Sequence, residues 1–328
     1  MNYRRLGRSG LKVSTIILGT MNFGDATPKE EAVKIIDAAL DEGINCIDCA
    51  DIYAGGKSEE IVGEALKRGA KRDKVLITTK VFWKTGDNPN DGGNTKHHII
   101  EECNRSLKRL KTDYIDIYFL HRTDFNVPQE ESLEALDLLV KQGKVRYIGC
   151  STHPVWRIVE AFWIAELHNL TKFVCEEPPY NLLERRIENE LIPACKTYDL
   201  GIITWSPLAQ GLLAGNYQNI ENLPEGSRAT RSPVYRERIT KEGIKISRKF
   251  AEFSKKIGIT PAQFAVSWVL HQEGITGTII GPRTLYQFKE LIKASDIKLG
   301  KRELNYCDKL VPPGQFVSNH FNTSLWMK

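Results

Sequence analysis

Four side chains that hold or transfer protons stand out in the first part of the chain: Asp48, Tyr53, Lys80 and His121. A tyrosine has a reference pKa of about 10, and a neighbouring lysine ammonium lowers it by stabilising the phenolate. We expect Asp48 to hold Lys80 charged, Tyr53 to donate a proton, and His121 to position a substrate carbonyl or relay the proton. No nucleophile or metal-ligand set accompanies these residues in the sequence. The predicted chemistry therefore needs an external reductant.

The stretch INCIDCADIY (44–53) also contains a C-x-x-C pair, Cys46 and Cys49. Successive side chains of a strand point to opposite faces, so Cys46 shares a face with Asp48 while Cys49 faces the other way. A redox dithiol needs a turn or a helix N-terminus, and a metal site needs two further ligands at suitable spacing. We interpret both cysteines as small packing residues, in a barrel interior and at a helix interface, and predict no metal site.

The composition is that of an ordinary globular protein of 328 residues, with 41% hydrophobic and 27% charged residues. The sequence has no long apolar run and no secretory leader, and its seven cysteines lack the spacing of a disulfide framework. The densest basic run, KRGAKRDK (67–74), is typical of a solvated helix end rather than of a nucleic-acid site. These features predict a cytoplasmic protein with reduced thiols that binds neither membranes nor nucleic acids.

Short β-branched runs alternate with amphipathic helical stretches such as 29–43 and 132–144, the pattern of repeated βα units around a parallel sheet. A doubly wound open sheet would have a G-x-G-x-x-G turn after an early strand, and the sequence has none there. The sequence therefore predicts the α/β class and a (β/α)8 TIM barrel. The eight predicted strands are 13–19, 44–50, 75–81, 114–121, 145–151, 172–178, 201–207 and 277–282.

Two segments lie outside this repeat. Residues 3–13 contain two short runs around a Gly/Ser turn and predict a hairpin that caps one mouth of the barrel. Residues 209–240 form an insertion too long and too rich in Pro and Gly for a plain connection, and such loops are usually functional or disordered. We expect residues 1–328 to form a single barrel domain with long loops at its C-terminal face.

The four ionisable residues fall where such a barrel places its active site, at the C-terminal ends of the strands. Asp48, Lys80 and His121 lie at the ends of the second, third and fourth predicted strands, and Tyr53 lies in the loop after the second. A buried lysine and a buried aspartate are costly unless they pair. We therefore expect three consecutive strands to bring these groups together at one rim.

Motifs along nearly the whole chain form a specific pattern: LGTMNFG (18–24), DCADIYAGGKSEEIVGEAL (48–66), ITTKV (77–81), YIDIYFLHRTD (114–124), GKVRYIGCST (143–152), PPYNLLERRIE (178–188), WSPLAQGLLAG (205–215) and GPRTLYQFKE (281–290). With them the chain resembles the aldo-keto reductase superfamily, most of all the branch of bacterial general aldo-keto reductases and potassium-channel β subunits. The resemblance implies that Asp48, Tyr53, Lys80 and His121 form the family's catalytic tetrad. It also implies that a hydride passes from the nicotinamide C4 of NADPH to small aldehydes or ketones.

The resemblance further implies a set of cofactor contacts, with Trp205 stacked on the nicotinamide and Arg283 near the ribose. The loops after the seventh and eighth strands are a frequent phosphate site of this barrel. A guanidinium suits a 2′-phosphate, which favours NADPH over NADH. The implied cofactor residues are Gly19, Thr20, Met21, Asp48, Ser151, Thr152, Glu177, Trp205, Ser206, Pro207, Leu208, Gln210, Gly211, Gly281, Arg283, Gln287 and Glu290.

Three positions depart from the family pattern. Thr152 stands where many members have Asn, and Glu177 stands where they have Gln; both positions usually hold the nicotinamide carboxamide. A carboxylate at 177 accepts a hydrogen bond from the amide NH2 but has no proton to donate to its carbonyl. Leu291 replaces an Asn that commonly touches the adenine.

The substrate pocket is predicted to have aromatic walls around Tyr53 and His121. Phe82, Trp83, the loop 84–93 and the tail 316–328 would supply them, although Trp83 and Trp326 are equally interpreted as loop-packing residues. The sequence thus favours an NADPH-dependent reductase of small carbonyl compounds, as a monomer or a weak homo-oligomer. The alternative is a redox-sensing regulatory subunit that binds the nucleotide and acts through a protein partner.

Overall fold

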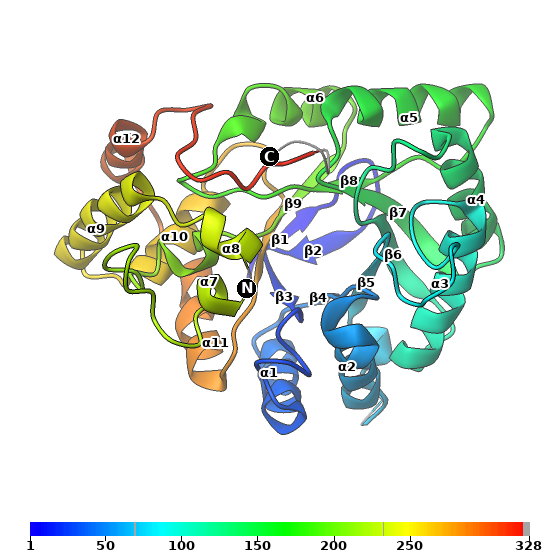
Figure 1. The fold of residues 1–328 in the computed structure, drawn as a ribbon, viewed down its shortest axis with the longest axis horizontal. Helices are drawn as coiled ribbons and strands as arrows, with labels where there is room; N and C mark the ends of the chain where they lie inside the picture. The colour runs from blue at the N-terminus through cyan, green and yellow to red at the C-terminus, as the bar shows by residue number, and fades with distance from the viewer. Residues whose placement is uncertain (69, 232, 324–328) are drawn as a thin grey trace.

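The computed structural model describes residues 1–68, 70–231 and 233–323. Eight parallel strands close into a barrel in the order β10-β3-β4-β5-β6-β7-β8-β9, with helices around its outside (Figure 1). This confirms the predicted (β/α)8 architecture. The barrel strands are β3 (Ile16–Gly19), β4 (Cys46–Asp48), β5 (Leu76–Val81), β6 (Ile115–Leu120), β7 (Val145–Ser151), β8 (Cys175–Glu177), β9 (Gly201–Thr204) and β10 (Gly277–Ile280).

Most strands are shorter than the runs predicted for them, while β7 has the predicted bounds. The predicted strand 13–19 is wrong as a unit, because Lys12–Ser14 pairs in the hairpin and only Ile16–Gly19 enters the barrel. The predicted strand 201–207 ends early, since Ser206 has a φ of 63°, which is incompatible with extended backbone. Apolar and β-branched residues therefore continue past the strands into buried loops at the rim.

The helices largely follow the predicted amphipathic stretches. The helix predicted from Ser132 begins earlier, at Gln129, and the basic run 67–74 follows the end of α2 at Lys67, as predicted. The helices are α1 (Lys29–Asp41), α2 (Lys57–Lys67), α3 (Lys96–Leu110), α4 (Gln129–Lys141), α5 (Val155–Leu167), α6 (Leu191–Thr197), α7 (Arg228–Arg231), α8 (Pro233–Glu237), α9 (Lys241–Lys256), α10 (Pro261–Leu270), α11 (Leu285–Leu291) and α12 (Lys301–Leu310). Within the described ranges, no helix combines the length and the apolar character that crossing a membrane requires.

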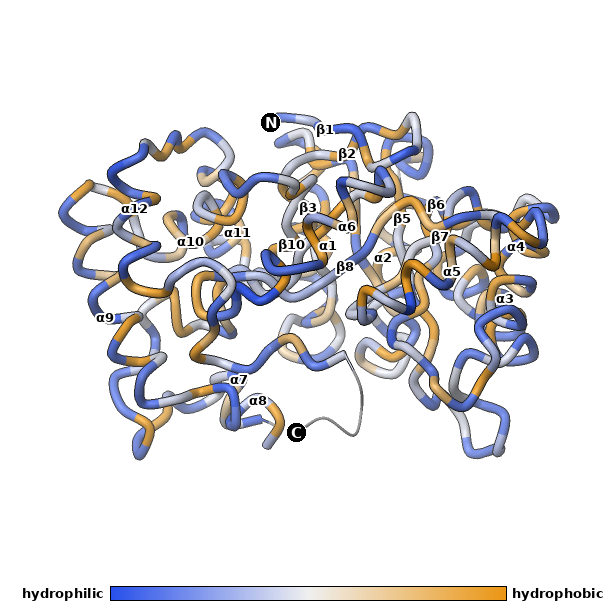
Figure 2. Tube along the Cα trace, turned by 90° about the horizontal axis from the view of Figure 1, so that it is seen from above, coloured by the Kyte–Doolittle hydropathy of each residue, from blue (hydrophilic) through white to orange (hydrophobic). Residues whose placement is uncertain are grey.

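The predicted N-terminal hairpin is confirmed. Strands β1 (Tyr3–Arg5) and β2 (Lys12–Ser14) pair antiparallel, and Leu6 and Val13 are fully buried against the barrel interior. The hairpin packs at the start of β9, where an added Cβ on Gly7 would lie 2.4 Å from the amide nitrogen of Gly201. Figure 2 shows β1 and β2 on the side of the molecule opposite α7 and α8. The hairpin therefore closes the N-terminal mouth and leaves the C-terminal mouth to the insertion 209–240.

Two apolar clusters lie on the two sides of the barrel wall. Cys46 belongs to the cluster inside the barrel, with Ile17 and Phe119, whereas Cys49 belongs to the cluster between strands and helices. The predicted alternation of β4 is therefore confirmed. It also directs Asp48, two residues after Cys46, to the inside of the barrel at its C-terminal end.

Phe119 fills the barrel interior because β7 has a glycine opposite it. An added Cβ on Gly149 would lie 2.6 Å from the Phe119 ring and 3.0 Å from the carbonyl oxygen of Cys175. The Phe119 ring in turn lies 5.9 Å from the Lys80 Nζ. Gly149 therefore leaves room for the Phe119 ring, which lies next to the Lys80 ammonium.

We expect Gly149→Ala to lower the free energy of unfolding by about 1–3 kcal/mol, since an extra methyl group in a packed interior forces its neighbours to move. Urea unfolding followed by circular dichroism measures the change. Gly10→Ala is the matched control, because an added Cβ there has no atom within 4 Å among the described residues. Equal stabilities for the two variants would contradict this account of the barrel interior.

Candidate active site

A cavity of about 970 Å³ lies at the C-terminal ends of the barrel strands. Its wall includes residues that follow most of the strands and residues of the insertion 209–240. The structure brings most of the predicted site residues to this wall: Gly19, Met21, Asp48, Tyr53, Trp83, His121, Ser151, Thr152, Glu177, Trp205, Ser206, Pro207, Leu208, Gln210, Gly211, Gly281, Arg283, Gln287 and Glu290.

Some predicted residues do not reach the cavity wall. Thr20 is fully buried, and its hydroxyl donates to the carbonyl oxygen of Asp48 at 2.9 Å, so it supports the strand end instead. Phe82 is buried with its ring 5.1 Å from that of Trp83, and the loop 84–93 lies away from the cavity wall. Trp326 lies outside the described residues.

Lys80 lies fully buried beneath the cavity, between two carboxylates. Its Nζ donates to Asp48 Oδ1 and to the carbonyl oxygen of Cys49 at 2.8 Å, and lies 3.3 Å from Glu177 Oε1. Thr78 Oγ1 donates to the same Asp48 oxygen at 2.6 Å. Burial lowers the pKa of Lys80, but the charges of Asp48 and Glu177 outweigh it and hold the pKa well above its usual value. Lys80 is therefore an ammonium ion at every pH of interest.

Tyr53 projects over this charged group from the loop after β4. It opens the short 3-10 helix η1 (Tyr53–Gly56), in which Ala54, Gly55 and Gly56 all have positive φ angles. The Lys80 Nζ lies 5.4 Å from the centre of the Tyr53 ring. The tight turn therefore brings a phenol from the loop back over the lysine.

The pKa of Tyr53 is raised above its usual value, so the predicted net lowering is wrong. Burial raises it most, Lys80 lowers it, and Asp48 and Glu177 raise it. The sequence-based argument counted the ammonium but left out the burial of the phenol, which is the largest cause, and the charge of Glu177. Tyr53 is therefore protonated at neutral pH, as a proton donor must be.

His121 directly follows β6, and its ring meets the Tyr53 ring edge to face, with centroids 6.0 Å apart at 81°. Its backbone N–H donates to the carbonyl oxygen of Val81 at 2.9 Å, which fixes the loop beside β5. Burial and the positive charges of Lys80 and Arg122 hold the pKa of His121 well below its usual value. The imidazole is therefore neutral and can hydrogen-bond to a carbonyl oxygen without adding charge.

Glu177, at the end of β8, is buried on the cavity wall. Its Oε2 has no hydrogen-bond partner among the described residues. Burial and the charge of Asp48 raise the pKa of Glu177 well above its usual value, although Lys80 opposes them. The site therefore holds one lysine between two acids, and the second acid is more readily protonated than an exposed glutamate.

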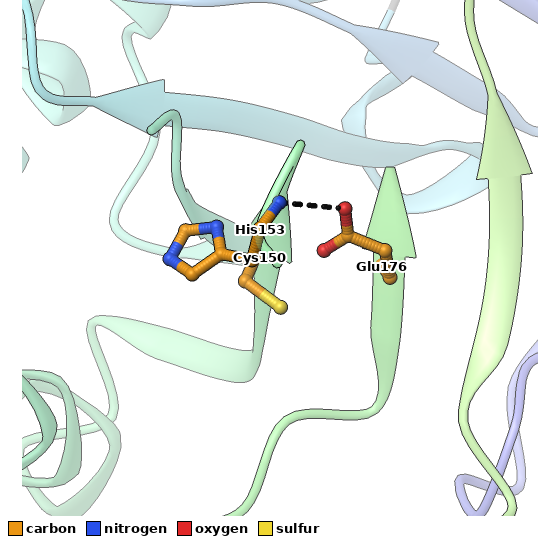
Figure 3. A group of neighbouring side chains, drawn as sticks. All are labelled: Cys150, His153 and Glu176. Carbon is orange, nitrogen blue, oxygen red and sulfur yellow. Dashed lines mark hydrogen bonds between the residues drawn. The ribbon is translucent and has the colours of Figure 1, made fainter. Parts of the chain in front are cut away.

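A second buried acid, Glu176, supports the loop after β7. Its Oε1 accepts from the backbone N–H of His153 at 3.1 Å, and His153 Nδ1 hydrogen-bonds with the carbonyl oxygen of Ser151 at 3.0 Å. Figure 3 shows the imidazole turned away from the carboxylate, with the Cys150 sulfur below. Burial raises the pKa of Glu176 to about 8. This group holds the turn at Thr152, where φ is 54°, against the cavity.

The sequence-based reasoning missed several polar residues of the wall, most of them from the insertion. The length of this segment marked it as functional or disordered, but its short polar helices gave no periodic signal. Arg122 stands directly after His121 in the HRTD motif, which was quoted without a role for the arginine. The missed polar residues are Asn22, Asp25, Arg122, Asn216, Tyr217, Glu225, Ser227, Arg228, Arg231, Tyr235 and Arg238.

Comparison with known proteins agrees with this barrel. The sequence profile of the Aldo/keto reductase family matches residues 15–312. An uncharacterised oxidoreductase of Bacillus subtilis, YrpG, is 40% identical over 325 residues, covering 96% of this chain and 97% of YrpG. A probable voltage-gated potassium channel subunit beta of rice is 37% identical over 309 residues, covering 90% of this chain and 92% of the rice protein. A putative voltage-gated potassium channel subunit beta of Schizosaccharomyces pombe is 38% identical over 320 residues, covering 94% of this chain and 90% of the yeast protein.

The chain therefore belongs to the Aldo/keto reductase family, and the predicted resemblance is confirmed. Membership in this family makes the protein an oxidoreductase with a small-molecule substrate.

Glu177→Gln should stabilise the protein increasingly as the pH rises. Because the folded-state pKa of Glu177 is raised, its contribution to stability is fully present below about pH 4, near the reference value for glutamate, and is lost as the pH rises. Glutamine does not ionise, and its amide oxygen still accepts from Lys80. We expect the variant to gain at least about 1 kcal/mol over the wild type between pH 5 and pH 8, since one pKa unit corresponds to about 1.4 kcal/mol.

Urea unfolding of both proteins at the two pH values measures this difference. The exposed Glu190→Gln makes the same chemical change away from the cavity and should show no such trend. A pH-independent difference for Glu177→Gln would mean that Glu177 ionises as freely in the folded state as in the unfolded chain.

Proposed function

We propose that the protein is an NADPH-dependent reductase of small aldehydes and ketones. The observation that supports this most is the Lys80 ammonium, buried between Asp48 and Glu177 and lying 5.4 Å from the Tyr53 ring at the floor of the cavity. A protonated phenol over a fixed positive charge suits proton donation to a carbonyl oxygen, because the charge stabilises the phenolate that remains.

The residues of the cavity wall fit a nicotinamide dinucleotide. Glu177 Oε2 is a buried acceptor without a described partner, placed to accept from the carboxamide NH2. Trp205 lines the cavity and offers a flat face for stacking, and Gln210 and Gly211 have positive φ angles in the loop after β9, where phosphate often binds in this barrel. The bound cofactor supplies the hydride for the carbonyl carbon.

The chain's own groups then handle the proton and the orientation of the substrate. Tyr53 donates its hydroxyl proton to the carbonyl oxygen as the carbon accepts the hydride, and Lys80 stabilises the phenolate. Asp48 keeps Lys80 in place, and neutral His121 holds the carbonyl oxygen by a hydrogen bond. The same steps in reverse oxidise the alcohol.

We further propose that residues 1–328 act as one barrel domain, in the cytoplasm, as a monomer or a weak homo-oligomer. All of the cysteines are free and buried, which suits a reducing compartment. The alternative of a regulatory subunit rests only on the printed names of the channel-subunit relatives, and no observation on the described residues favours it.

Arg283 should give the protein a preference for NADPH over NADH. It lines the cavity at the start of α11, and its Nη1 donates to the carbonyl oxygen of Gly226 at 3.1 Å without a described carboxylate partner. Hydrogen bonds to charged groups imply a preference of roughly 10- to 100-fold in Kd. Titration of both cofactors by quenching of tryptophan fluorescence measures it.

Arg283→Ala should remove most of this preference, whereas Lys289→Ala, an exposed cation on the same helix, should keep it. Equal affinities of the wild type for both cofactors would remove Arg283 from this role.

Tyr53→Phe tests the proton donor. The change removes one hydroxyl and little volume, so the fold and the NADPH affinity should survive, while kcat for aldehyde reduction falls by about 10²- to 10⁴-fold. Tyr198→Phe, a ring stacked on Phe162 outside the cavity, is the control. If Tyr53→Phe retained more than about a tenth of the wild-type kcat, well outside that range, Tyr53 would not be the acid.

A further inference from the structure

Four arginines of the cavity wall lack an acidic partner among the described residues: Arg122, Arg228, Arg238 and Arg283. Arg122 and Arg238 also interact electrostatically with one another. Neither has a carboxylate oxygen within 4.0 Å among the described residues. Two other partly buried arginines are paired, Arg109 with Glu59 and Glu102, and Arg185 with Glu188. A buried cation without a counter-ion is costly, so the unpaired state of two neighbouring cavity arginines calls for an explanation.

Arg122 lies next to the reacting groups. Its charge is close enough to His121 to lower the pKa of that imidazole, and its own pKa responds to Tyr53. Its Nη1 donates to the main-chain carbonyl oxygen of Asn322, which holds the C-terminal tail. Burial and the charge of Arg238 lower the pKa of Arg122 to about 10. The two guanidinium groups therefore lie within electrostatic reach of one another beside the tetrad.

Arg238 follows α8 and reaches the same part of the cavity from the insertion. Its Cζ lies 5.8 Å from the centre of the Trp205 ring and 5.8 Å from that of Tyr235. With the Gln210 amide oriented to satisfy both of its groups, the amide oxygen accepts from Arg238 Nη1 at 2.7 Å. A neutral amide and two aromatic rings position the guanidinium without cancelling its charge.

The carboxylates nearest to this pair are engaged elsewhere or exposed. Glu176, near Arg122, accepts from the backbone of His153. Glu184, near Arg238, is bound by Arg186, and Glu237 is exposed. Asp48 and Glu177, on the cavity floor, flank Lys80. The described residues therefore leave an excess of positive charge on the wall above the tetrad.

We propose that Arg122 and Arg238 form a subsite that binds a carboxylate of the substrate, so that the preferred substrates are aldehydes or ketones carrying a carboxylate. This inference rests on the proposed reductase function and deepens it. A guanidinium presents a planar fork of donors that matches a carboxylate, and two of them bind it with fixed orientation. Holding the distal carboxylate sets the carbonyl group over Tyr53 and His121.

The pyrophosphate of the cofactor is the other anion that this pair could bind. Measuring cofactor affinity separately from substrate preference distinguishes the two. If Arg238 served the pyrophosphate, Arg238→Gln would weaken NADPH binding and leave the preference among substrates unchanged.

The test compares two aldehydes that differ in charge, 4-carboxybenzaldehyde and its neutral methyl ester, methyl 4-formylbenzoate. For the wild type we expect kcat/KM to favour the acid by roughly 10- to 100-fold, the range for hydrogen bonds to a charged group. Arg122→Gln and Arg238→Gln should each remove most of that ratio, with NADPH affinity changed by less than about threefold, well inside the same range. Added salt should raise KM for the acid only.

Arg236→Gln is the matched control, since Arg236 is an exposed arginine of α8 outside the cavity wall and its variant should keep the wild-type ratio. A wild-type ratio near one, or a ratio that survives both cavity substitutions, would overturn the subsite. Loss of NADPH affinity with an unchanged ratio would assign the arginines to the cofactor instead.

Failure of the proposed function would look different, because neither aldehyde would then be reduced. In that case 4-carboxybenzyl alcohol is titrated against the wild type and both variants by tryptophan fluorescence, which needs no turnover. Saturable binding that both cavity substitutions weaken about tenfold or more supports the subsite, and equal binding by all three proteins overturns it.

Discussion

The structure at the C-terminal mouth of the barrel depends on one buried cation, the Lys80 ammonium. A lysine inside a barrel is tolerated only when its charge is matched. Here Asp48 and Glu177 approach it from different strands, and the carbonyl oxygen of Cys49 accepts a further hydrogen bond from it. The parallel register fixes these positions, because Asp48 pairs with Thr78 and Lys80 with Phe119. The rigid sheet therefore keeps the lysine and the two carboxylates close together, which a flexible loop would not do.

The same cation organises what lies above it. The Tyr53 phenol is protonated because burial and two carboxylates outweigh one ammonium. His121 is neutral because burial and the positive charges of Lys80 and Arg122 lower its pKa. A protonated phenol and a neutral imidazole over a fixed cation suit proton donation to a carbonyl oxygen. The insertion 209–240 then lines the cavity with arginines, so positive charge on the wall stands above one lysine and two acids on the floor.

The sequence predicted the elements that repeat and missed those that depend on contacts across the barrel. The alternation of strand residues placed Cys46 and Cys49 on opposite faces, and the βα pattern placed Asp48, Lys80 and His121 at one rim; the structure agrees. The approach of Glu177 to Lys80 joins β8 to β5, strands far apart in the sequence and not neighbours in the barrel, so no local spacing predicts it. The direction of the Tyr53 pKa was wrong mainly because the burial of the phenol, which raises the pKa most, depends on packing between segments far apart in the sequence. Arg122 and Arg238 were missed because whether an arginine has an acidic partner depends on contacts between segments that are far apart in the sequence.

The most direct test of the central claim is the transfer of labelled hydrogen. NADPH carrying deuterium on the transferred position of nicotinamide C4 is incubated with the protein and benzaldehyde, and the benzyl alcohol is analysed by mass spectrometry. The account predicts one deuterium on the alcohol carbon for each NADPH consumed, with the hydroxyl proton coming from solvent through Tyr53. Bound NADPH that is not consumed, or an alcohol without the label on its carbon, would contradict it.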